Sequence, residues 1–123
     1  MKREIKFRGF NSDINKITET FEIGSFLSEK TCDIIMQYTG KKDKNGIEIY
    51  EGDICKTNDD FYKDDKKNKK LLITIKWSQE ACAYFACKGK EEVPLSWFSH
   101  FEFSTIEVIG NIYENPELIK DKL

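Results

Sequence analysis

Short runs in which apolar and polar residues alternate, separated by turn-forming residues, recur along this sequence of 123 residues. The clearest run carries an apolar side chain at every second position: Leu71, Ile73, Ile75 and Trp77. A period of two places these side chains on one face of a β-strand. The run 81–87 can pair with it as a hairpin, and 106–112 alternates in the same way. We expect these three strands to share one antiparallel sheet.

Weaker runs of the same kind occupy the N-terminal third, over residues 5–8, 17–23 and 31–38. The polar segment 40–46 ends in Asn-Gly, which tolerates the positive φ of a tight turn, and predicts a turn there. A second turn is expected at residues 52–53.

Helix signals are few. Pro94 can open a single turn through residues 95–98. Asn115 and Pro116 form a plausible cap and start for a short helix over 117–120.

Many short strands separated by turns predict a mainly β fold. The order of the runs after residue 46 resembles an SH3-like barrel, with additional N-terminal strands and short helical turns. We expect one domain over 1–123, since most domains hold about 100–150 residues. Within it, the N-terminal strands would take 1–46, the barrel about 47–113 and the terminal helix 115–120.

Two segments half a chain apart resemble the signature of the YopX-like family, whose members are carried by bacteriophages and prophages. They are MQYTGKKDKNGIEIYEGDI, residues 36–54, and EVIGNIYENPEL, residues 107–118. The opening strand REIKFR at 3–8 is also similar to the start of family members. The resemblance implies the same barrel fold and a phage or prophage setting in a bacterial host. It implies no activity.

The bulk charge gives no drive toward nucleic acid or anionic membranes, because the net charge is only −2. The N-terminus has no apolar stretch of the signal-peptide kind, and no apolar run approaches the ~20 residues that span a bilayer. We therefore expect a cytoplasmic protein. In that compartment its cysteines would be reduced: Cys32, Cys55, Cys82 and Cys87.

The cysteines do not predict a metal site, because no C-x-x-C pair occurs and His100 is the single histidine. Small buried hydrophobes are the better interpretation. His100 has Ser99 and Glu102 nearby in sequence, but these do not form a nucleophile–base pattern. The acids at 59–65 lack the spacing and the glycine of a calcium loop. We predict no enzyme activity, no metal and no cofactor.

The aromatic residues are too numerous for all of them to fit inside one small barrel. Some are expected to form an exposed apolar patch, which is typical of a protein interface. The interface candidates are Trp77, Tyr84, Trp97, Phe98 and Phe101. The partner would be a second copy of the chain or a host or phage protein.

A nucleic-acid-binding loop is the alternative interpretation. Its aromatic and basic candidates are Phe61, Tyr62, Lys66, Lys67, Lys69 and Lys70. Aromatic rings can stack on bases while lysines contact phosphates. Against this, four aspartates among the five lysines of 59–70 leave a charge of only +1.

The polar residues of the signature segments also admit two interpretations. They are Glu48, Glu51, Asp53, Asn111, Glu114 and Asn115. They can line a shared site, which a hydrolytic enzyme would require, or form turns. The second interpretation is favoured because Asn, Asp and Gly are turn formers. The signature glycines point the same way: Gly40, Gly46, Gly52 and Gly110.

Overall fold

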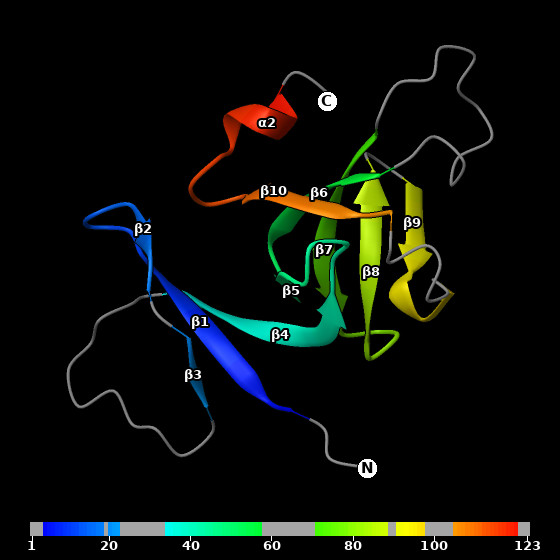
Figure 1. The fold of residues 1–123 in the computed structure, drawn as a ribbon, viewed down its shortest axis with the longest axis horizontal. Helices are drawn as coiled ribbons and strands as arrows, with labels where there is room; N and C mark the ends of the chain where they lie inside the picture. The colour runs from blue at the N-terminus through cyan, green and yellow to red at the C-terminus, as the bar shows by residue number, and fades with distance from the viewer. Residues whose placement is uncertain are drawn as a thin grey trace.

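Over the residues that it describes, a computed structural model shows two five-stranded sheets and little helix (Figure 1). It describes residues 4–18, 20–22, 34–57, 71–88, 91–97 and 105–120. No helix within these ranges is long and apolar enough to cross a membrane.

The first sheet holds the N-terminal strands. These are β1 (Lys6–Asn11), β2 (Lys16–Ile17), β3 (Phe21–Glu22), β4 (Ile34–Lys42) and β5 (Glu48–Tyr50). β1 pairs with β4 on one side and with both β2 and β3 on the other. The run predicted over 17–23 is therefore two short strands. In β4, buried Met36 and Tyr38 alternate with more exposed neighbours, as a strand with one face on a core requires.

The second sheet is the barrel-like part. Its strands are β6 (Asp53–Thr57), β7 (Leu71–Ser78), β8 (Ala83–Lys88), β9 (Glu91–Pro94) and β10 (Glu107–Asn111). Their order is β10-β6-β7-β8-β9, so a four-stranded meander is closed by a fifth strand beside the first. The 3₁₀ turn η2 (Leu95–Trp97) follows β9, close to where Pro94 predicted a turn. The mainly β, barrel-like fold predicted from the sequence is confirmed.

The three strands with the clearest alternation do share this sheet, with β6 inserted between β10 and β7. The hydrophobic core draws on both sheets and on η2. Its buried residues are Ile49, Cys55, Ile73, Ile75, Ala86, Leu95 and Ile106. Trp77 continues the face of Ile75, but its side chain is 45% exposed. The face of β7 that is buried at Ile75 is therefore partly exposed to solvent at the C-terminal end of the strand.

A turn over residues 43–47 fastens the first sheet to the second. The turn is shorter than predicted, because β4 continues through Gly40 to Lys42. Asp43 is buried, and its Oδ1 accepts hydrogen bonds from the backbone amides of Asn45 and Ile47, both at 2.8 Å. Its Oδ2 accepts the amide of Val108 on β10 at 2.9 Å. We call this set of contacts the Asp43 latch.

The C-terminal helix forms as predicted, as α2 (Glu117–Lys120). The predicted cap is wrong in one respect. The side-chain oxygen of Asn115 accepts the backbone amide of Asn111 at 3.2 Å, behind the helix, rather than an amide of the helix itself. Its main-chain carbonyl accepts the Leu118 amide at 3.1 Å.

Candidate functional site

A groove of about 670 Å³ lies where the two sheets meet. Four segments line it: residues 35–36 of β4, 51–52 between β5 and β6, 75–80 at the end of β7 and its following turn, and 112–113 after β10. Its volume lies within the ~300–1,000 Å³ of ordinary ligand sites. We call it the junction groove.

Gly52 fixes the geometry of the groove lining. Its amide donates to the carbonyl of Ile75 at 2.7 Å, and its carbonyl accepts the Ile112 amide at 2.9 Å. Its φ of +86° is a conformation that L side chains rarely adopt. An added Cβ would lie 3.1 Å from Met36 Sδ and 3.3 Å from the Tyr113 ring. Only glycine meets both demands without strain.

Trp77 is the exposed aromatic side chain of the groove lining. It pairs across the β7–β8 hairpin with Tyr84. The two ring centroids are 4.9 Å apart at an interplanar angle of 67°, an edge-to-face contact. Trp77 is thus held in place on one side while nearly half of its surface stays in solvent.

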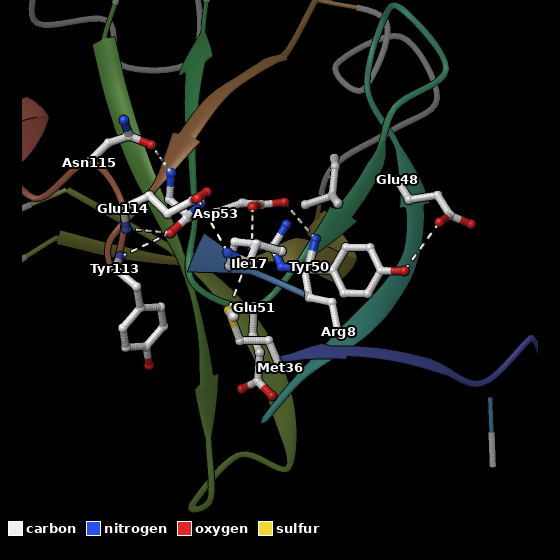
Figure 2. A network of polar contacts seen from close by, with 12 residues as sticks. Arg8, Ile17, Met36, Glu48, Tyr50, Glu51, Asp53, Tyr113, Glu114 and Asn115 are labelled. Atoms are coloured by element: carbon white, nitrogen blue, oxygen red, sulfur yellow. Dashed lines mark hydrogen bonds and ion pairs between the residues drawn. The ribbon is translucent and has the colours of Figure 1, made fainter. Parts of the chain in front are cut away.

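Arg8 and Asp53 form a buried ion pair, and Arg8 also contacts Met36 of the groove lining (Figure 2). Arg8 Nη2 on β1 donates to Asp53 Oδ1 at 2.5 Å, and Asp53 Oδ2 accepts the Tyr50 amide at 2.7 Å. The guanidinium also lies 4.7 Å from the Tyr50 ring centroid and donates to Met36 Sδ at 3.6 Å. Burial raises the pKa of the Asp53 carboxyl, and the charge of Arg8 opposes that shift. Both carboxylate oxygens are engaged by the scaffold.

A second polar group surrounds Glu48. Its Oε2 accepts Lys6 Nζ at 2.6 Å, and its Oε1 accepts the Tyr50 hydroxyl at 3.2 Å. The hydrogen bond to Glu48 raises the pKa of Lys6. Burial, followed by the charge of Glu48, raises the pKa of Tyr50 to about 12. Lys6 also lies over the Tyr38 ring at 5.9 Å.

A third group forms the turn after β10. Asn111 Oδ1 accepts the amides of Tyr113 and Glu114 at 3.0 and 2.8 Å. Asn111 Nδ2 donates to Glu114 Oε1 at 3.0 Å, and Glu114 Oε2 accepts the Ile17 amide of β2 at 3.3 Å. Two contacts connect these polar groups. Tyr50 bonds both Asp53 and Glu48, and Asp53 is opposite Asn111 in the β6–β10 register. Of the acids among the polar signature residues, Glu51 lines the junction groove.

The structure unites some of the predicted interface residues and separates others. Trp77 and Tyr84 are in contact. Trp97 is 73% exposed on η2 and is not part of the groove lining. Phe98 and Phe101 lie outside the described residues. So do all six nucleic-acid candidates, Phe61, Tyr62, Lys66, Lys67, Lys69 and Lys70, and that interpretation stays a prediction.

The cysteines that the structure describes are free thiols in different settings. Cys55 and Cys87 are buried, whereas Cys82 is exposed in the β7–β8 turn. Within the described ranges, no group of three or more His, Cys, Asp or Glu side chains is placed to hold a metal ion. Cys32 and His100 fall outside those ranges.

The sequence made Trp77 an interface candidate but did not predict the groove whose lining includes it. The signature segments supply Met36, Glu51, Gly52 and Tyr113 to the lining, and the hairpin supplies Trp77. The signature segments and the aromatic interface candidates, which were separate features of the sequence, both contribute to the lining of the junction groove. The sequence does indicate a turn at Gly52. It does not indicate that this turn contacts Ile75 and Ile112, which are distant in sequence.

Comparison with known proteins supports the fold and the family. The family model described as YopX protein matches residues 6–120. The crystal structure of protein EF1440 from Enterococcus faecalis is similar, with a TM-score of 0.57 and 24% sequence identity. That match covers 97% of this chain and 100% of the other. No curated protein matches.

Proposed function

This chain belongs to the YopX protein family, and we propose that it acts without catalysis, by binding another protein in the junction groove. The observation that carries the proposal is Trp77, which is 45% exposed yet anchored edge-to-face on Tyr84. Tryptophan is enriched among the residues that dominate binding energy at protein interfaces. A fixed ring loses little side-chain entropy when a partner covers it.

The lining around Trp77 also favours binding over catalysis. The Gly52 backbone is hydrogen-bonded on both sides, to Ile75 and to Ile112, so the groove is formed before a partner arrives. Asp53 is the buried carboxyl nearest in sequence to the groove lining, and both its oxygens already accept hydrogen bonds. Such a carboxylate is a poor general base, because accepting a proton would disrupt its hydrogen bond and ion pair with Arg8.

The setting we propose is the cytoplasm of a bacterium that carries a phage or prophage. The resemblance of residues 36–54 and 107–118 to the family signature supports it. The free, buried thiols of Cys55 and Cys87 are compatible with a reducing compartment.

Site-directed photo-crosslinking in a bacterial host tests the proposal. A photoreactive phenylalanine analogue is placed at Gln79, which lines the groove, and separately at Ile14, which is 62% exposed in the β1–β2 turn. We expect one discrete crosslinked protein from position 79 and none from position 14. Trp77→Ala should abolish the crosslink.

Trp97→Ala is the matched control, since it removes the same side chain from a more exposed position outside the groove. It should leave the crosslink intact. Equal crosslinking from both positions, or a crosslink that survives Trp77→Ala, would overturn the proposal. Light scattering of the purified chain and of Trp77→Ala distinguishes a second copy from a different protein as the partner.

A further inference from the structure

Resting on the proposed function, we infer that the partner segment is basic: it places an arginine or lysine side chain against Trp77, beside Glu51 and Glu80. The inference names the chemistry of the occupant, which the proposed function leaves open. Its basis is the distribution of charge around one exposed indole ring.

The charged residues of the groove lining are Glu51, Glu80 and Lys76. Lys76 stands between Ile75 and Trp77 on β7, and successive side chains of a strand point to opposite faces. By this alternation Lys76 shares the face of Thr74, whose partner across the β7–β8 pair is Cys87, and not the face of Trp77. The carboxylates of the lining therefore outnumber its one ammonium group by two to one.

Glu51 is held at the groove wall by its own hydrogen bond. Its Oε1 accepts the Gln37 backbone amide at 2.9 Å, which orients the carboxylate from the β5–β6 turn. Glu80 is exposed in the turn that follows β7. One carboxylate is therefore fixed and the other is adjustable, and they come from two different segments of the lining.

Trp77 suits a cation better than a neutral side chain. An indole face attracts ammonium and guanidinium groups, and tryptophan is the strongest aromatic side chain in this respect. Nearby carboxylates add a charge-assisted hydrogen bond that a neutral ligand cannot make. Ring and acids together recognise the positive charge of arginine or lysine.

The same groove has room for an apolar neighbour of the basic residue. Ile35 is 57% exposed at its edge, and Met36 and Ile112 pack around Gly52. The volume of about 670 Å³ exceeds that of one side chain. An extended segment with a basic residue flanked by apolar residues fits this lining.

The experiment uses the full chain as the Trp97→Phe variant, so that Trp77 is the single tryptophan of the two in the sequence. A random dodecapeptide library is selected on this protein and counter-selected on the Trp77→Ala variant. Three acetylated heptapeptides are then titrated while Trp77 fluorescence is measured. They share isoleucine flanks and differ at the central residue, which is arginine, norleucine or glutamate.

We expect the selected peptides to be enriched in arginine and lysine, and the arginine probe to bind at least about ten-fold more tightly than the glutamate probe. Glu80→Gln and Glu51→Gln should each weaken arginine binding about three-fold, and raising the salt concentration should weaken it further. Glutamine keeps the acceptor that Gln37 needs, so Glu51→Gln preserves the turn. Glu91→Gln, an exposed acid on β9, is the matched control and should have no effect.

The two possible failures are distinct. Peptides that bind through Trp77 without basic residues, or a norleucine probe that binds as well as arginine, overturn the inference and leave the proposed function standing. Selection that yields no Trp77-dependent peptide overturns the inference, and its combination with a lost crosslink at position 79 overturns the proposed function as well.

Discussion

Arg8 and Asp53 form an ion pair at 2.5 Å that joins β1 of the first sheet to β6 of the second. Their side chains are 12% and 1% exposed. Through Arg8 the pair contacts Met36, one of the lining residues of the junction groove. The relative position of the two groove walls therefore depends on an interaction that water hardly reaches.

Removing one partner of this pair should destabilise the fold strongly. Asp53→Ala leaves the Arg8 guanidinium buried and unpaired, which costs about 3 kcal/mol in the free energy of unfolding. Urea denaturation measures the loss. Glu107→Ala is the control, because its 3.9 Å contact with Lys44 joins two partly exposed side chains. That change should cost less than about 0.5 kcal/mol. Similar losses for both variants would contradict the structural importance of Arg8–Asp53.

Tyr50 should make the protein lose stability at alkaline pH. Its pKa rises from the usual 10.0 to about 12 in the fold, chiefly through burial. Between these values the unfolded chain releases the phenolic proton and the folded chain keeps it. Stability contributed by this group is therefore complete below pH 10 and falls as the pH rises toward 12. Thermal unfolding at a series of pH values should show this fall, and Tyr50→Phe should reduce it. An unchanged slope in Tyr50→Phe would refute the assignment.

Gly52→Ala should cost more stability than Gly46→Ala. Both glycines have positive φ, +86° and +80°, so alanine is strained by about 1 kcal/mol at either position. At Gly46 an added methyl group meets nothing within 4 Å, whereas at Gly52 it presses on Met36 and Tyr113. The extra loss at Gly52 should be about 1–3 kcal/mol. Denaturation of the two variants side by side measures the difference. Equal losses would show that Met36 and Tyr113 can move to accommodate the methyl group at no cost in stability.

The Asp43 latch should protect a specific backbone amide. Asp43→Ala removes the acceptor of Val108, and of Asn45 and Ile47 in the turn. Hydrogen exchange of the Val108 amide should accelerate by at least about ten-fold, the equivalent of 1.4 kcal/mol. The Ile73 and Ile75 amides in the centre of the sheet should change far less. Uniform acceleration would mean that the variant unfolds globally and that the latch has no local role.

The strands could be predicted from the sequence where alternation was regular. β7 and β8 follow the predicted hairpin, because buried Ile73, Ile75 and Ala86 repeat with the period of a pleated strand. β9 was missed, since Glu91–Pro94 contains a single aliphatic residue and a proline. Its place is set by pairing with β8 rather than by its own pattern.

The site could be predicted only in part. Exposure of Trp77 followed from an excess of aromatic residues, but the roles of Arg8 and Asp43 did not, because their partners stand 45 and 65 residues away. A charged residue in a sequence indicates solvent by default, and only a tertiary partner changes that expectation. The junction groove needs four segments to be in position together, which no local pattern records.

The Asp43 latch also constrains the order in which this chain can fold. Val108 is synthesised 65 residues after Asp43, and β10 must be present before β6 gains its second neighbour. On the ribosome, the first hundred residues therefore emerge with one edge of β6 unpaired and with Asp43 lacking its bond to β10. Contacts of such long sequence separation form slowly, because the chain loses the entropy of loop closure before the contact stabilises it. The nascent chain carries an open strand edge until residues 107–111 arrive, and folding of the barrel waits for the last strand.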